Sequence, residues 1–379
     1  MKEATLDKLN LFIVMFFISL IMRIQVPVFT PYAASLGASS ILIGIIFSVT
    51  SFTNLVGNLL AGPLVDRFGK KMFITVPLFA SGGLFIAHGL ASDSGDLLLL
   101  HGLNGFALAF LIPAAFTLLS GYANNSQQQG KNMAINGILS TIASIIAPLV
   151  GGKLVVLIGY VNTYYFIGIA IILTGMYSIR FLQDRQVVII DKRNQAPIDN
   201  RRIHSVSNLA VVYLIGFAVM YTHGVIIFEV PYLTVEKGFS TFDTGQLFSY
   251  MGIGTFITLS LFFINRFDPL KRLGLGLFGM SIALFCLFTS LLPLPFLLFV
   301  IGLFFGLVMP AMATAITESA TKQTHGRAFG YMSAVFSLGM IVSSFVTGAI
   351  RDIISPYFIA FLVGMVVLTV AGYSKLRSA

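Results

Sequence analysis

The sequence predicts an all-α membrane protein with 12 transmembrane helices in two pseudo-symmetric six-helix bundles. Of its 379 residues, 57% are hydrophobic and only 10% are charged, whereas a soluble domain carries about 25% charged residues. Apolar runs close to the length of a spanning helix, about 20 residues, recur along the whole chain. The two halves also repeat each other in sequence. Because the bilayer core offers the backbone no hydrogen-bond partner, each run should form an α-helix.

The apolar runs fall into two sets of six, separated by the only long polar connection. The first set covers approximately 9–31, 41–62, 73–91, 97–120, 132–158 and 161–182, and the second covers 208–232, 243–264, 273–292, 294–317, 327–350 and 353–374. The connection, 183–207, mixes charges without a helical apolar period, so we interpret it as a cytoplasmic linker. The expected domains are an N-terminal bundle, 1–182, and a C-terminal bundle, 208–379.

The positions of lysine and arginine predict the orientation. If both termini are cytoplasmic, the outer loops hold only Lys153, Lys237 and Arg351, and Arg23 lies within the first helix. The remaining 19 of the 23 basic residues then lie on the inner side. Cytoplasmic loops carry an excess of basic residues, so we expect a multi-pass protein of the cell membrane with both ends inside.

The net charge of +9 does not indicate nucleic-acid binding, because the basic residues lie in short loops and not on one polar face. The expected surroundings are a lipid bilayer. Cys286 is the only cysteine, so no disulfide can form within the chain.

An internal repeat relates the two halves at an offset of about 200 residues. Pro31-Tyr32 corresponds to Pro231-Tyr232, Gly44 corresponds to Gly245, and "PAAFT" at 113–117 corresponds to "PAMAT" at 310–314. The matches follow one another in order, which indicates duplication. Transporters are often built from such repeats, with the substrate site at the repeat interface near the membrane midplane.

The stretch "GPLVDRFGKK", 62–71, puts four charges between two apolar runs. With the two six-helix halves and the linker, this stretch resembles the major facilitator superfamily. The family motif runs Gly-x-Leu-x-Asp-Arg-x-Gly-Arg/Lys-Lys, and the matching residues here are Gly62, Leu64, Asp66, Arg67, Gly69, Lys70 and Lys71. The resemblance covers nearly the whole chain.

The resemblance implies that Asp66 contacts the N-terminus of the eleventh helix, around Gly326 and Arg327, and closes the cytoplasmic side. Exposed N–H groups at a helix N-terminus favour a negative charge. The alternative is that the turn only holds the loop inside, for which Lys70 and Lys71 would suffice.

The fifth run contains "APLVGG", 147–152, which resembles the Gly-Pro-x-x-Gly-Gly signature of proton-coupled exporters in this superfamily. Pro148 bends the helix, and Ala147, Gly151 and Gly152 offer a smooth face for close packing. The resemblance implies export. The alternative is a kinked helix with small-residue packing, a common feature of membrane bundles.

Ionisable residues within the runs are candidates for function, because charge is costly in hydrocarbon. Arg23 suits an anionic or zwitterionic substrate, or else forms an ion pair with Glu229. His223, which matches Arg23 in the repeat, and Glu229 are candidates for handling protons. The alternative is a hydrogen-bonded core histidine and an interfacial glutamate.

His101 lies in "HGLNG", where exporters of the superfamily often have Arg-x-x-Gln-Gly. The departure removes the arginine but supplies a titratable group, so His101 is a third candidate for proton coupling. We expect His88 nearby, in a structural role. Gln25, Asn54 and Asn58 are candidates to bind substrate or to tie helices together.

These features predict a proton-coupled efflux antiporter of a small organic molecule, working by alternating access. A proton-coupled importer is the alternative, and a membrane enzyme or channel is a more distant one. The sequence has no Gly-x4-Gly-Lys-Ser/Thr loop, His-Glu-x-x-His helix or Gly-x-Ser-x-Gly elbow, so we expect no enzyme, cofactor or metal site. The resemblance implies that a single chain, a monomer, is the working unit.

Overall fold

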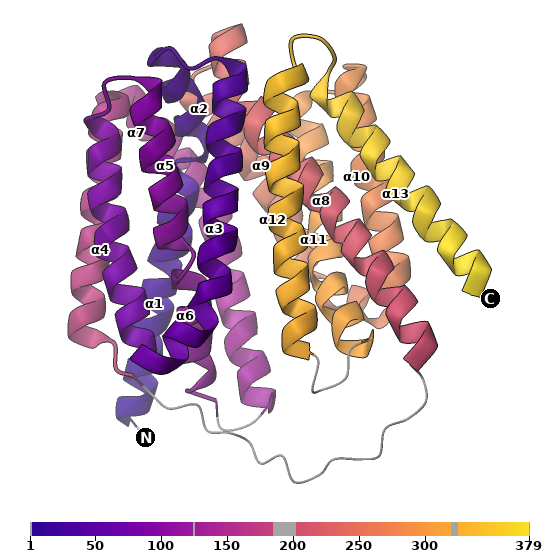
Figure 1. Ribbon diagram of the computed structural model, residues 1–379, viewed down its shortest axis with the longest axis horizontal. Helices are drawn as coiled ribbons and strands as arrows, with labels where there is room; N and C mark the ends of the chain where they lie inside the picture. The colour runs from indigo at the N-terminus through magenta and orange to yellow at the C-terminus, as the bar shows by residue number, and fades with distance from the viewer. Residues whose placement is uncertain (1, 124–125, 185–201, 320–324, 379) are drawn as a thin grey trace. The chain divides into compact units, whose positions relative to one another are not determined.

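The computed structural model describes residues 2–123, 126–184, 202–319 and 325–378, and contains no β-strand within these ranges (Figure 1). The chain divides into two compact units. The first comprises Met1–Gln195 with Leu233–Gly245, and the second comprises Ala196–Tyr232 with Gln246–Ala379. Most of the predicted linker, 185–201, lies outside the described residues.

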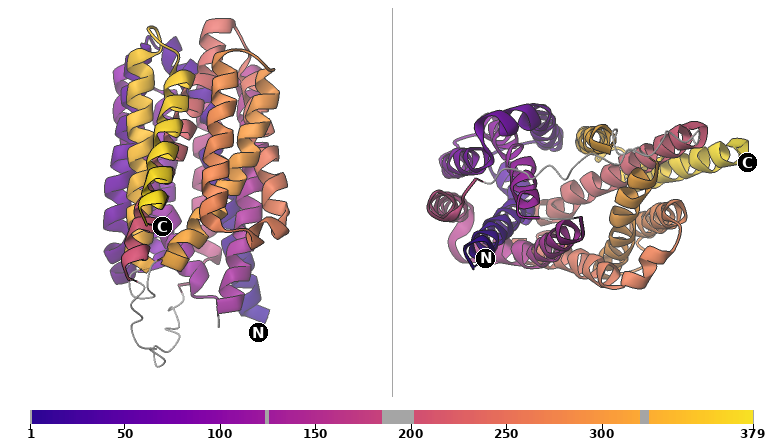
Figure 2. Two further views of the ribbon diagram at one scale, coloured as in Figure 1. Left: turned by 90° about the vertical axis from the view of Figure 1, so that its right-hand side faces the viewer. Right: turned by 90° about the horizontal axis from the view of Figure 1, so that it is seen from below.

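The first unit is a bundle of helices that run side by side, seen side-on and end-on in the two views of Figure 2. Its first and fourth predicted spans are each broken in two. Pro27 follows the first break and Pro113 the second, and each proline lacks the N–H that a continuous helix would need. The helices are α1 Lys2–Ile24, α2 Val26–Ser35, α3 Ser40–Phe68, α4 Lys70–Gly89, α5 Ser94–Leu108, α6 Leu111–Ser120 and α7 Ser126–Phe181.

Helix α7 contains both the fifth and the sixth predicted spans. A straight helix of its 56 residues would be about 84 Å long, far longer than the roughly 30 Å hydrocarbon core. Gly159 interrupts it with a φ of 78° and a ψ of 173°. Two arms result, 126–158 and 160–181, and α7 packs against both α1 and α4.

The second unit contains the six remaining predicted spans. Its elements are α8 Arg202–Lys237, α9 Thr241–Ser260, the 3-10 helix η1 Phe262–Arg266, α10 Pro269–Phe288, α11 Leu294–Ser319, α12 His325–Ile350 and α13 Pro356–Ser378. The last turn of α8 and the start of α9, within 233–245, belong to the first unit.

The number of spanning helices agrees with the predicted fold. Ten segments within the described residues are long and apolar enough to cross a membrane. Division of α7 at Gly159 adds one span. The helix α9 has 20 residues and accounts for the twelfth, although its polar side chains Asp243 and Gln246 keep it out of the ten apolar segments.

The distribution of side chains suits a lipid environment. Large apolar side chains project from the bundle, and Leu59, Val76 and Leu99 are each more than half exposed. Polar side chains are enclosed instead, among them Ser81, His88 and Asn104. This arrangement is the reverse of a soluble protein's and places the polar chemistry of the first unit in its interior.

Candidate functional site

The small residues of 147–152 lie where two backbones approach helix α7. Ala147 is fully buried, and Gly151 and Gly152 are buried beside it. A Cβ atom on Gly151 would collide with the carbonyl group of Ile24, the last residue of α1. A Cβ atom on Gly152 would collide with the carbonyl group of Thr241, at the start of α9. Only glycine permits these contacts.

The contact with the start of α9 is reinforced from the other side. A Cβ atom on Gly245 would meet the carbonyl oxygen of Pro148. The Thr241 hydroxyl donates a hydrogen bond of 2.9 Å to the carbonyl oxygen of Gly152. We call the contacts of Gly152 and Gly245 between α7 and α9, together with the contact of Gly151 with Ile24, the glycine joint. It lies within the first unit, which includes 233–245.

The charged turn is a break between two helices. α3 ends at Phe68, and α4 begins at Lys70. Gly69 between them has a φ of 99°, and residues with a Cβ atom avoid this backbone region. The turn is bound to the end of α7: Asp184 Oδ1 accepts a hydrogen bond of 2.8 Å from the Lys71 backbone N–H. A carboxylate in this position satisfies and neutralises the N-terminus of α4.

Lys71 also bonds to α7 through its side chain, because its Nζ donates to the carbonyl oxygen of Ile179 at 2.7 Å. Sequence reasoning missed Asp184, which is 113 residues away from Lys71. No local pattern connects them.

The structure shows fewer contacts for the other residues of the turn. Arg67 is exposed, with its guanidinium carbon 5.1 Å from the Phe68 ring. Arg327 is exposed near the start of α12. The side chain of Asp66 and the surroundings of Gly62 lie outside what the structure describes. The expected contact of Asp66 with the eleventh span therefore stays a prediction.

Two histidines meet in the interior of the first unit. His88, near the end of α4, lies with its Nε2 3.1 Å from Nδ1 of His101 in α5. Both are buried. The Phe29 ring stacks on His101 with a centroid distance of 3.9 Å, and Tyr164 stacks on His88 at 5.3 Å. The structure therefore joins His101, a candidate for proton coupling, to His88 in one aromatic-lined cluster.

Hydrogen bonds position this cluster. The Tyr32 hydroxyl donates to the carbonyl oxygen of His88 at 2.7 Å, and the Ser81 hydroxyl donates to Asn104 Oδ1 at 2.6 Å. Asn104 thus ties α5 to α4.

The candidates for substrate binding lie on α1, between α1 and α2, and on α3. Arg23 is half-buried, and its Nη1 donates to the carbonyl oxygen of Ser19 at 3.3 Å. Gln25 lies between α1 and α2, and within the described part of the chain its Oε1 has no hydrogen-bond partner.

Asn54 and Asn58 form a ladder on α3. Asn54 donates to the carbonyl oxygen of Gly105 at 3.1 Å, and Asn58 donates to Asn54 Oδ1 at 2.8 Å. The bond from Asn54 ties α3 to α5, one of the two roles that the sequence left open, whereas the bond from Asn58 lies within α3.

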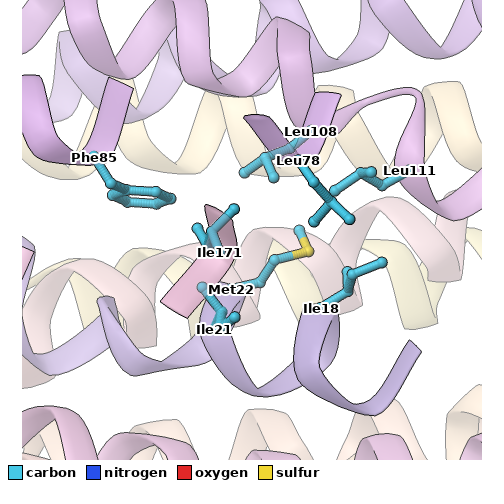
Figure 3. A pocket seen from close by; sticks show the side chains of 8 residues that line it. All are labelled: Ile18, Ile21, Met22, Leu78, Phe85, Leu108, Leu111 and Ile171. Carbon is cyan, nitrogen blue, oxygen red and sulfur yellow. The ribbon is translucent and has the colours of Figure 1, made fainter. Parts of the chain in front are cut away.

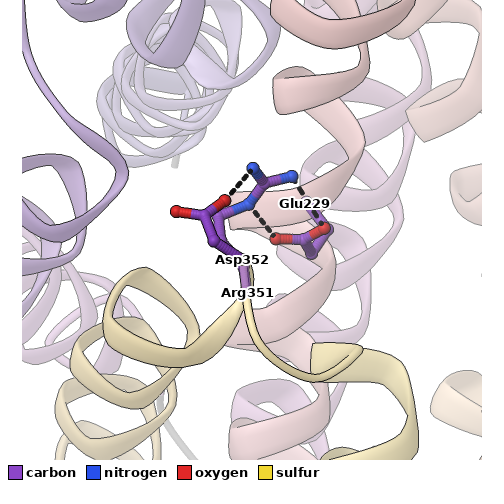
Figure 4. Close-up of polar contacts among 3 residues, drawn as sticks. All are labelled: Glu229, Arg351 and Asp352. Carbon is purple, nitrogen blue, oxygen red and sulfur yellow. Dashed lines mark hydrogen bonds and ion pairs between the residues drawn. The ribbon is translucent and has the colours of Figure 1, made fainter.

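In the second unit, Glu229 forms a buried ion pair with Arg351 (Figure 4). The distances are 3.0 Å from Nε to Oε1 and 3.4 Å from Nη2 to Oε2. The guanidinium carbon of Arg351 lies 3.6 Å above the Tyr232 ring. This pairing differs from the pairing of Glu229 with Arg23 that the sequence left open. His223 stacks on Phe305 instead, at 5.1 Å.

A small apolar pocket lies inside the first unit (Figure 3), and one of its lining residues, Met22, directly precedes Arg23 in the sequence. Side chains from α1, α4, α5, α6 and α7 line it, and none of them is polar. They are Ile18, Ile21, Met22, Leu78, Phe85, Leu108, Leu111 and Ile171. The pocket contains none of the expected substrate-binding side chains.

Comparison with known proteins gives one consistent family. The Major Facilitator Superfamily matches residues 11–294 and 262–376. An uncharacterized MFS-type transporter of Methanocaldococcus jannaschii is 25% identical, with 86% of each chain covered. The multidrug resistance protein MdtG of a Rahnella species is 24% identical over 87% of this chain and 82% of its own.

Two further matches extend this result. The 4-hydroxybenzoate transporter PcaK of Pseudomonas aeruginosa is 23% identical over 83% of this chain and 77% of its own. Among solved structures, a bacterial homolog of the human lysosomal transporter Spinster, in an inward-facing and occupied conformation, superposes with a TM-score of 0.73. It is 16% identical and covers 98% of this chain and 96% of its own.

Proposed function

Because the chain belongs to the Major Facilitator Superfamily, we propose that it is a proton-coupled efflux antiporter of a small organic molecule. It is a multi-pass membrane transporter and not an enzyme. The proposal adds the direction, the coupling ion and the mechanism, alternating access. It also includes an orientation with both termini in the cytoplasm, a place in the cell membrane, and a single working chain.

The glycine joint carries the proposal. Gly151 and Gly152 stand in the place of the exporter signature, and both are buried against backbone. A joint made of backbone on backbone separates and closes again with little side-chain rearrangement. It supports a contact that is broken and remade in each cycle, and the proline in the same motif supports bending of the helix there.

The relatives support both export and the kind of substrate. The name of MdtG describes a multidrug resistance protein, which favours export. The name of PcaK describes a transporter of 4-hydroxybenzoate, an aromatic carboxylate. Arg23, held at 3.3 Å by a backbone carbonyl on its own helix, suits an anionic group of this kind.

The remaining candidates receive roles in the same proposal. Proton coupling belongs to His101 in the first unit and to His223 and Glu229 in the second. Gln25 contributes its buried Oε1 to substrate binding. The charged turn, through Asp66, closes the cytoplasmic side.

The test uses inside-out membrane vesicles whose lumen is acidified, with 4-hydroxybenzoate and the cationic dye ethidium as probes. An antiporter takes up the probe while protons leave, so addition of the probe lowers the imposed pH gradient. Movement of probe and protons in the same direction, or transport that does not respond to the gradient, would overturn the proposal.

A matched pair of variants tests the glycine joint. Gly152→Ala places a methyl group against the Thr241 backbone, whereas Gly137→Ala, on the same arm of α7, adds one where no atom lies within 4 Å. We expect Gly152→Ala to slow gradient-driven transport at least tenfold and Gly137→Ala to leave it unchanged. Equal rates in the two variants would remove the joint from the mechanism.

A further inference from the structure

The hydrogen bonds of the histidine pair determine where its hydrogens lie. His88 Nδ1 lies 2.7 Å from the carbonyl oxygen of Leu84. A carbonyl group only accepts, so His88 Nδ1 carries the hydrogen, and in a neutral ring Nε2 is then an acceptor. The hydrogen in the 3.1 Å contact between the two rings therefore belongs to His101 Nδ1.

The same reasoning leaves one bare nitrogen on the pair. A neutral imidazole has one N–H, and His101 uses it to bond to His88. Nε2 of His101 therefore has a free lone pair, and within the described ranges no hydrogen bond to it is present. Among the four ring nitrogens of the two histidines, it is the one that can take up a proton without breaking a hydrogen bond described here.

We propose that His88 and His101 form a proton-binding relay and that Nε2 of His101 is the atom that accepts the proton. This inference rests on the proposed antiport function and names its proton site. When Nε2 of His101 binds a proton, the hydrogen on its Nδ1 can pass to Nε2 of His88. One proton enters and none leaves, so the pair gains one positive charge, which then resides on His88.

The neighbouring rings suit a positive charge on either member. Phe29 stacks on His101 with an interplanar angle of 24°, and Tyr164 stacks on His88 at 14°. A cation over an aromatic face is stabilised by the ring quadrupole. His88 also keeps its bond to Leu84 O in both states.

The other titratable groups around the pair are tyrosines. Tyr32 bonds to the backbone of His88, Tyr160 stacks on Tyr32, and Tyr165 donates to Gly89 O at 3.4 Å. α3 contributes the apolar ring of Phe47, and α6 contains no titratable residue. On α5, the helix of His101, the nearest carboxylate is Asp96, which is exposed and accepts a hydrogen bond from the backbone N–H of Ser92.

No carboxylate contacts the pair within the residues that the structure describes. A bound proton therefore adds an uncompensated positive charge to the interior of the first unit. Such a charge is costly in a membrane protein. Protonation of the pair thus favours whichever state of the transporter surrounds the charge with more polar groups or water, and a coupling ion acts through such a difference.

A substitution separates this role from a structural one. In His101→Asn the amide nitrogen takes the place of Nδ1 and keeps the donor to His88, but the atom corresponding to Nε2 is lost. In His101→Gln a polar group is kept near Nε2 and the donor to His88 is lost. A structural hydrogen bond is rescued by asparagine, whereas a proton site is rescued by neither.

The experiment follows the histidine nitrogens by NMR in the full chain, labelled with ¹⁵N-histidine in phospholipid nanodiscs. The chain has five histidines, and His101→Asn and His88→Asn assign two of them. We expect His101 Nε2 to be unprotonated at high pH and to gain a proton as the pH is lowered. The His88 nitrogen signals should shift in the same step and lose this shift in His101→Asn.

Transport is measured in parallel in proteoliposomes with labelled 4-hydroxybenzoate. We expect His101→Asn to keep the thermal stability of the wild type and to lose gradient-driven uptake. A His101 that stays unprotonated at every pH at which the wild type shows gradient-driven uptake, or a His101→Asn variant with wild-type gradient-driven uptake, would overturn the relay and leave antiport intact. Wild-type transport that ignores the gradient would overturn antiport, and the NMR titration still decides whether the pair binds a proton.

Discussion

Replacement of Glu229 by glutamine should destabilise the second unit by several kilocalories per mole. The side chains of Glu229 and Arg351 are only 9% and 6% exposed. Removal of one partner from a buried pair costs about 3–5 kcal/mol, because the other charge loses the buried partner that offset its desolvation. Glu229→Gln keeps the shape of the side chain and removes only its charge, so we expect a loss in this range.

The geometry also predicts which variant loses more free energy of unfolding. Arg351→Gln removes the ion pair and the contact with the Tyr232 ring at 3.6 Å. It should therefore cost roughly 0.5–2 kcal/mol more than Glu229→Gln, the range of a cation–π contact. The double variant removes both charges of the pair and should cost less than the sum of the two single variants.

The free energy of unfolding of each purified variant is measured by denaturant titration in mixed micelles. Asp352→Asn is the matched control, because Asp352 also contacts Arg351, at 3.5 Å, but is 71% exposed. An exposed pair contributes about 0–1 kcal/mol. Equal losses for Glu229→Gln and Asp352→Asn, or additive losses in the double variant, would refute the reasoning.

Three further outcomes follow from the first unit. Gly69→Ala should lower the free energy of unfolding by about 1–2 kcal/mol, since it forces a Cβ atom into a left-handed backbone region beside Asp184; an unchanged denaturation midpoint would contradict this. Asp184→Ala removes the cap on the Lys71 N–H and should cost about 0.5–2 kcal/mol, with faster amide hydrogen exchange at the start of α4 as the readout. Asn54→Ala breaks the bond to Gly105 and should cost roughly 0.6 kcal/mol, typical of hydrogen bonds between membrane helices. Its apparent affinity for 4-hydroxybenzoate should stay at the wild-type value, and a large change would assign Asn54 to the substrate instead.

Hydropathy was sufficient to predict the fold, because the bilayer imposes both the length and the helical form of each span. The structure and the family comparison confirm the predicted fold class. The breaks within two of the spans did not follow from hydropathy. Gln25 interrupts the first span, which is apolar on both sides of it, and the proline that follows was the available signal.

The site was predictable where the chemistry lies in one residue type, and unpredictable where it depends on a partner. His101 was recognisable as a titratable group in a membrane helix. Its bond to His88, the capping of α4 by Asp184 and the pairing of Glu229 with Arg351 each join distant parts of the chain. A single sequence contains no signal for such pairings, because side-chain direction and helix packing decide them.

The turn at Gly159 has a mechanical consequence for the first unit. It leaves the two arms of α7 joined by a single non-helical residue. One arm contributes the glycine joint, and the other leads to Ile179 and Asp184, which hold Lys71 at the charged turn. The glycine joint beside the turn and the Lys71 contacts near the C-terminal end of α7 are thus attached to the same hairpin, so a rotation of that hairpin as one body would loosen or tighten both together.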